Sequence, residues 1–207
     1  MPKARPLQRI YSIAETDMND NSCSNQQITL PPCGLLALGI SLVAYISCQV
    51  GLFEFSIYYS GIILLIAGGI QIMIGLRSQQ QGNSYAAAIL LPFGFFWLSI
   101  IGYEVFPKLG FGQHPGSTAM FAYLTMWAIF VAIQFFGSFK QNITLQYLYG
   151  MIMVCLLSLS INQLREDQVF LAIGCVFGIV AAIIAVSTAL AQFSEQWTGR
   201  YHRAVPH

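Results

Sequence analysis

The chain has 207 residues, of which 56% are hydrophobic and 8% charged, with a formal net charge of +1. A soluble domain carries about a quarter charged residues, so this composition is typical of an integral membrane protein. The near-neutral charge and the lack of a dense Lys/Arg cluster exclude nucleic acid as a partner, and too little chain lies outside the apolar segments for a second globular domain.

Residues 1–28 are polar and mix both signs of charge with Asn, Ser and Gln. Such a segment cannot bury enough apolar surface to fold, so we expect a disordered cytoplasmic tail. It also lacks a short apolar core followed by a small-residue cleavage site, and we therefore expect no signal peptide.

The first apolar segment is introduced by Thr29-Leu30-Pro31-Pro32-Cys33-Gly34. Prolines suit the first turn of a helix, and Thr29 can cap it. Along the predicted helix, residues spaced three or four apart share one face that is less apolar than the others. This face either packs against a neighbouring helix or lines a path. Its members are Gly34, Leu38, Ser41, Tyr45 and Cys48.

A membrane-spanning helix needs about 20 apolar residues, and six segments meet or approach that length. Because backbone amides in hydrocarbon must be satisfied internally and the runs do not alternate, helices are favoured over a barrel. We predict an all-α membrane domain over 29–194, followed by a cytoplasmic tail over 195–207. An inverted repeat of two three-helix halves is left open, since their sequence match is weak. The predicted spans are 34–53, 56–76, 84–106, 118–139, 144–164 and 169–193.

The loops between these spans differ in charge from one side to the other. Basic residues gather on one side, which by the positive-inside rule is the cytoplasm, so both termini are expected there. That side holds Arg77, Lys140, Arg200 and Arg203, whereas the other holds Lys108 and Arg165 beside Glu54, Glu166 and Asp167.

Ionisable residues do not occur in the middle of any predicted span, although Glu54 and Glu104 lie at span ends. This argues against an enzyme that works within the membrane. His114 lies between Pro and Gly residues and is interpreted as a turn residue. The five cysteines lack the spacing of metal ligands, so neither a metal nor a cofactor is expected.

Small, polar and aromatic residues remain as candidates. Small residues around Gly68 and around Gly178 favour helix packing, Gln71 is a polar residue within a span, and Asn83 is a predicted helix cap. An aromatic cluster near the middle of the third span fits a core plug or a constriction better than an interfacial belt. It consists of Phe93, Phe95, Phe96 and Trp97.

Several stretches, taken together, resemble the acetate uptake transporter family, which includes the bacterial succinate–acetate permeases. Pro32, Gly34 and Leu35 match its Asn-Pro-Ala-Pro-Leu-Gly-Leu signature, while Thr29, Leu30 and Cys33 depart from it. The resemblance runs from about Thr29 to Arg200. Further matches are Gly82-Asn83, Phe93-Gly94-Phe95-Phe96-Trp97, Pro107-Lys108-Leu109-Gly110, Tyr123 with Trp127, Phe135-Phe136-Gly137-Ser138-Phe139-Lys140, Leu145-Gln146 and Gly199-Arg200.

This resemblance implies six-helix protomers that assemble as hexamers, each with its own path for acetate and in some members succinate. It also implies that the path is narrowest at three positions, which the family fills with Phe, Tyr and Leu. By register these positions are Leu38, Phe93 and Ile152 here, all apolar and without the tyrosine hydroxyl. A hydrophobic constriction of this kind can gate by expelling water.

We therefore expect a transporter or channel for acetate and related small carboxylates. It should lie in the lipid bilayer of the cell membrane and assemble as a homo-oligomer. Burying an unpaired carboxylate is costly. Passage must rest on polar groups such as Ser41, Gln71 and Asn83, with Thr29 and Tyr45 as further candidates, or on a proton carried with the substrate, which we prefer. The alternatives are a channel for small neutral solutes such as ammonia, urea or water, and a non-transporting scaffold or sensor.

Overall fold

The computed structural model describes residues 30–53, 57–140 and 142–204, and within these ranges it contains helices and no strand. Each of the six long helices includes a stretch that is long and apolar enough to cross a membrane. The prediction of an all-α, six-span, multi-pass membrane protein is confirmed. The long helices are α2 (Pro32–Gln49), α3 (Ile62–Gln80), α4 (Ser84–Glu104), α5 (Ser117–Gly137), α6 (Ile143–Arg165) and α7 (Gln168–Ala204), with short turns η1 (Ile57–Gly61), η2 (Pro107–Leu109) and η3 (Ser138–Lys140).

The helix ends follow local sequence signals. The Asn83 side chain accepts a hydrogen bond from the Ala86 amide at 3.1 Å, which confirms the predicted cap of α4. Helix α2 ends at Gln49, short of the predicted 53, because the turn after it places Gly51 at a φ of 75°. Helix α7 continues past the predicted end of its span as far as Ala204. The predicted tail over 1–28, and also Thr29 and Glu54, lie outside the described residues.

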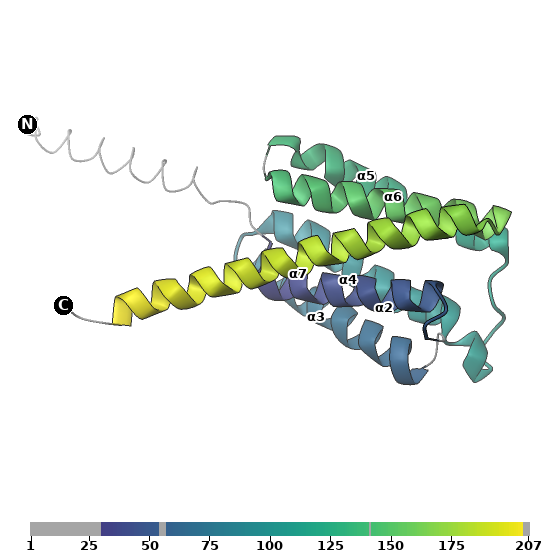
Figure 1. Ribbon diagram of the computed structural model, residues 1–207. Coiled ribbons are helices and arrows are strands. Elements are labelled where there is room, and N and C mark those ends of the chain that lie inside the picture. Colours follow the sequence, from purple (N-terminus) through teal and green to yellow (C-terminus); the bar gives the residue numbers. More distant parts are fainter. Residues whose placement is uncertain (1–29, 54–56, 141, 205–207) are drawn as a thin grey trace, which may run out of the picture.

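The six helices form a closed ring in the order α4, α3, α2, α7, α6, α5. Helix α2 packs against α3 and α7, α3 against α4, and α6 against α5 and α7. Consecutive helices run antiparallel, and α7 crosses between α2 and α6 before projecting beyond the bundle (Figure 1). Helices α2, α4 and α6 therefore all begin at the end where α7 leaves the bundle, which we call the near end; the opposite end is the far end.

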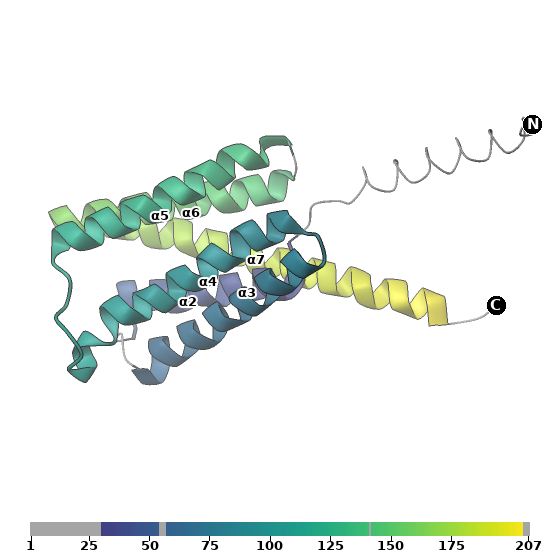
Figure 2. The same cartoon turned by 180° about the vertical axis from the view of Figure 1, so that it is seen from behind.

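The closure between α4 and α5 differs from the other contacts, because the backbones of these two helices stand further apart (Figure 2). Aromatic rings bridge them. The Phe96 ring centroid lies 5.1 Å from that of Trp127, and the Tyr103 centroid lies 4.7 Å from that of Tyr123. Closer to the middle of α4, Phe93 meets Phe130 edge-on at 6.0 Å. Aromatic pairs with these geometries stabilise a contact beyond the area they bury. We call this contact the aromatic seam.

Glycines bring α3 and α4 into close contact. A Cβ atom added at Gly94 would lie 2.5 Å from Cγ1 of Ile72 and 2.7 Å from the Gly68 carbonyl oxygen. Small residues allow such close approach of membrane helices. The predicted packing role of Gly68 is confirmed, and Gly178 likewise faces Ile46 of α2, whereas Gly69 has open space beside it.

The substitution Gly94→Ala should therefore destabilise the protein by about 1–3 kcal/mol, because a carbonyl oxygen of α3 cannot move aside for the new methyl group. The control is Gly102→Ala in the same helix, where nothing lies within 4 Å of the added Cβ. Thermal unfolding in detergent measures both. Equal melting temperatures for the two variants would contradict the packing assigned to Gly94.

Candidate functional site

Three apolar side chains from three helices lie at similar depth inside the ring. Leu38 is 0% exposed, and Phe93 and Ile152 are each 1% exposed, in one continuous buried cluster. They follow the first residues of α2, α4 and α6 by six, nine and nine positions. The helical rise places them about 9 to 14 Å from the near end. We call these three residues the neck; that they form the narrowest point of a path stays a prediction.

The predicted face of α2 is buried along its whole length. Gly34, Leu38, Ser41, Tyr45 and Cys48 are all inside the bundle. At the start of this face, a Cβ atom on Gly34 would lie 2.7 Å from Cδ1 of Leu90 on α4. Within the signature, Leu35 is buried as well, and Pro32 is the partly buried first residue of α2. The signature thus shapes the contact of α2 with α4 on the near side of the neck.

A polar layer lies one helical turn beyond the neck, towards the far end. The Gln71 amide nitrogen donates to the Ser41 hydroxyl at 3.2 Å, and both side chains are 0% exposed. The Ser41 hydroxyl in turn donates to the Ala37 carbonyl at 2.8 Å. Two polar atoms in this layer have no hydrogen-bond partner among the described residues: Oε1 of Gln71 and Nε1 of Trp97. We call Ser41, Gln71 and Trp97 the polar layer.

Aromatic rings complete this layer. The Tyr45 ring lies 5.9 Å from the Trp97 ring, and Trp97 follows Phe93 by one turn of α4. A buried polar group without a partner costs about 1–3 kcal/mol. The layer can therefore take a solute or water molecule that both donates and accepts hydrogen bonds. The sequence pointed to Ser41 and Gln71, but it did not assign a polar role to Trp97, which was interpreted only as an aromatic.

Two tyrosines lie on the near side of the neck. Tyr149, one turn before Ile152, is 0% exposed, and Tyr85 of α4 is partly buried. Asn83, the cap of α4, lies at this same end and is partly buried. Sequence reasoning missed both tyrosines, although the helical spacing of Tyr149 and Ile152 places them on one face.

Fixed charge is nearly absent from the interior. Among the buried residues of the described ranges, Glu104 is the only Asp, Glu, Lys, Arg or His. It ends α4, and its Oε2 lies 3.2 Å from Nε2 of His114. His114 lies in the loop before α5, as predicted, but its contact with Glu104 was not foreseen. A carboxylate inside the bundle would thus meet no cation in the described part of the chain.

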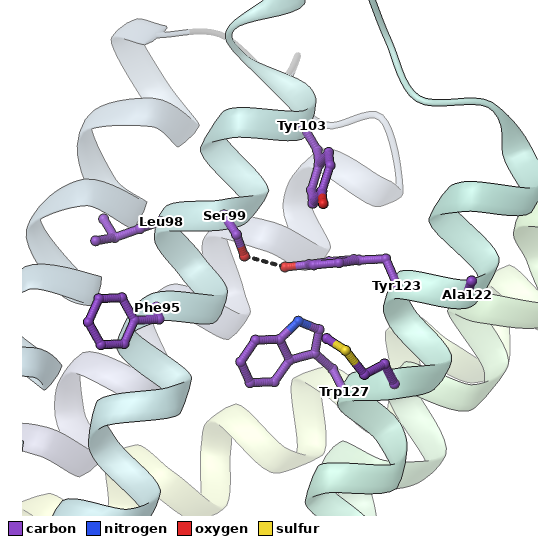
Figure 3. A pocket seen from close by; sticks show the side chains of 8 residues that line it. Phe95, Leu98, Ser99, Tyr103, Ala122, Tyr123 and Trp127 are labelled. Atoms are coloured by element: carbon purple, nitrogen blue, oxygen red, sulfur yellow. Dashed lines mark hydrogen bonds between the residues drawn. The ribbon is translucent and has the colours of Figure 1, made fainter.

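A pocket of about 740 Å³ lies along the aromatic seam, between α4 and α5 (Figure 3). The Tyr123 hydroxyl is hydrogen-bonded to Ser99 within it. Phe95 and Met126 are 56% and 55% exposed, so the pocket faces the surroundings of the bundle. The prediction that Phe95 belongs to a core plug is wrong, because the helical turn directs it outward while Phe93 and Trp97 point inward. The lining residues are Phe95, Leu98, Ser99, Tyr103, Ala122, Tyr123, Met126 and Trp127.

Comparison with known proteins places most of the chain in one sequence family. The profile described as the GPR1/FUN34/yaaH family matches residues 19–202. The succinate-acetate/proton symporter SatP of Escherichia coli (strain K12) is 27% identical over 173 residues, which cover 82% of this chain and 90% of that protein. Acetate permease A of Emericella nidulans is 23% identical over 197 residues, which cover 85% of this chain and 65% of that protein.

A solved structure shares the fold. The structure of the bacterial acetate channel SatP superposes with a TM-score of 0.73 at 25% sequence identity. The match covers 81% of this chain and 93% of that one. The arrangement of the six helices is therefore similar to that of a solved channel.

Proposed function

The chain belongs to the GPR1/FUN34/yaaH family, and from this membership we propose that it moves acetate and related small carboxylates across the membrane through the interior of its helix ring. The named relatives are a symporter, a permease and a channel, so we class the chain as a transport protein and not as an enzyme. By the same reasoning we propose that it acts in the cell membrane as a homo-oligomer, a hexamer by resemblance, and that succinate is a further substrate.

One observation carries this proposal: an apolar neck is followed directly by a polar layer whose hydrogen-bonding capacity is not used within the protein. The Trp97 indole nitrogen can donate to a carboxylate oxygen, and the Gln71 amide offers both a donor and an acceptor. The neck accommodates the methyl group of acetate while the carboxyl group binds to the layer. A purely structural core has no need of such unpaired groups.

The protonation state of the substrate follows from the same geometry. The described interior offers no cation, and transfer of an ionised carboxylate into such a site is costly. A protonated carboxyl group can both donate to Gln71 Oε1 and accept from Trp97 Nε1, which matches the two unpaired atoms of the layer. We therefore propose that a proton accompanies the carboxylate past the neck.

The test is flux into liposomes that contain the purified protein, with empty liposomes as the control. We expect labelled acetate to enter faster than in empty liposomes, and urea and ammonia to enter at the empty-liposome rate. Faster urea or ammonia entry without acetate entry would favour the neutral-solute channel, which the uncharged interior also suits. Equal rates for all three solutes with and without protein would favour a non-transporting scaffold.

Proton coupling is tested by varying pH while the concentration of acetate anion is held fixed. We expect the rate above that of empty liposomes to rise as pH falls, because the neutral acid becomes more abundant. A rate that does not change with pH would contradict the accompanying proton and leave anion transport intact.

A further inference from the structure

The contact between Glu104 and His114 joins the far end of α4 to the loop that leads into α5. The Glu104 side chain is 12% exposed and that of His114 is 51% exposed, so the acid is largely buried while the imidazole reaches the surface. Glu104 follows Trp97 by about two turns on the same helix. The pair therefore lies between the polar layer and the far end of the bundle.

Both imidazole nitrogens of His114 face oxygen acceptors. Nε2 lies 3.2 Å from Glu104 Oε2, and Nδ1 lies 3.0 Å from the Pro115 carbonyl oxygen. A neutral imidazole has one N–H group and can donate to only one of them, whereas the protonated imidazolium donates to both. Protonation of His114 thus completes both contacts and cancels the charge of Glu104. Loss of that proton leaves the pair with one net negative charge.

The surroundings of the pair connect it to the interior face of α2. The Glu104 carboxylate acts electrostatically on the Tyr45 hydroxyl and the Cys48 thiol, and Lys108 of η2 acts on that thiol as well. Because Tyr45 and Cys48 continue the buried face that carries Leu38 and Ser41, the charge of Glu104 acts on the far end of this face.

We propose that the Glu104–His114 pair controls the admission of carboxylate anions from the far end. When His114 is protonated the pair is neutral and an anion can approach, and when His114 is neutral the Glu104 charge repels it. Because protonation of the imidazole is what makes the pair neutral, admission is greater when the solution on this side is acidic than when it is alkaline. This inference rests on the proposed function, because it concerns the approach of the same substrate.

The experiment compares acetate flux into liposomes at outside pH 5.5 and pH 8 for the unchanged protein, Glu104→Gln and His114→Gln. Each variant's rate is divided by that of the unchanged protein at the same pH, so the protonation of acetate itself cancels. Glu104→Gln should have a ratio near one at pH 5.5 and roughly ten at pH 8, since the repulsion is removed. His114→Gln should have a ratio of roughly one tenth at pH 5.5 and near one at pH 8.

The matched control is Glu166→Gln, which removes an exposed carboxylate from the loop between α6 and α7 at the same end. Its ratio should stay near one at both pH values. Ratios for Glu104→Gln that are the same at pH 5.5 and pH 8 would overturn the inference while leaving acetate transport in place. Absence of acetate flux in the unchanged protein would instead overturn the proposed function, and this inference with it.

Discussion

Leu38→Trp is expected to reduce acetate flux at least tenfold. Leu38 is fully buried in α2, at the depth where Phe93 and Ile152 enter from α4 and α6. The helix backbone fixes the direction of the Cα–Cβ bond at position 38, so an indole side chain there must extend towards the central axis of the helix bundle. The neck would then be filled by a side chain that a solute cannot displace. Flux of labelled acetate into liposomes measures the effect.

The matched control is Ile40→Trp, two residues along the same helix, where the side chain is 45% exposed on the outer face. It should leave the flux unchanged. Overpacking costs about 1–3 kcal/mol, so Leu38→Trp is accompanied by Leu38→Ala, which widens the neck and should raise the flux. Unchanged flux in both Leu38 variants, with the protein folded by gel filtration, would remove Leu38 from the path. Tryptophan at Phe93 or Ile152 is expected to act as at Leu38.

Gln71→Leu is expected to lower acetate flux by up to about tenfold and, at the same time, to raise thermal stability. A hydrogen bond between neutral groups contributes about 0.5–1.5 kcal/mol, and the upper end of that range corresponds to about tenfold in rate. Stability should increase because Gln71 buries an amide oxygen that has no partner, and leucine has a similar size. The Ser41 hydroxyl keeps its bond to the Ala37 carbonyl, so no donor is stranded.

Flux and melting temperature of the same Gln71→Leu preparation separate the two possible roles of this residue. A residue that only holds helices together would lose stability on substitution, whereas a residue kept for substrate gains stability and loses flux. Gln80→Leu, on the exposed last turn of the same helix, should change neither quantity by much. A fall in stability with normal flux would show that Gln71 is a packing residue.

The fold was largely predictable from the sequence because hydrocarbon leaves few options. A continuous apolar run must satisfy its own backbone amides, so six runs give six helices, and short loops make them antiparallel neighbours. Boundaries were less accurate where a glycine decides the turn, as after Gln49, or where a helix continues beyond the apolar run, as α7 does. Residue composition alone indicates neither the glycine turn after α2 nor the continuation of α7.

The candidate site was predictable only where helical spacing is informative. Spacing placed Leu38 and Ser41 on one face, and the same rule would have separated Phe95, which points outward, from Phe93 and Trp97. The contact of Glu104 with His114 could not be predicted, because a loop of irregular backbone brings together two residues that share no period. The aromatic seam between α4 and α5 could not be predicted either, because which residues of the two helices face each other depends on how the six helices pack together.

The account depends on acetate passing through the interior of the ring, and thiol labelling of Ser41→Cys tests this most directly. The native cysteines are first replaced by serine or alanine, and a small, uncharged, water-soluble methanethiosulfonate reagent is then added to liposomes. The account predicts that the thiol at position 41 reacts, that acetate slows the reaction, and that a thiol introduced by Ile40→Cys on the outer face does not react. A thiol at position 41 that is as unreactive as the one at position 40, with or without acetate, would contradict it.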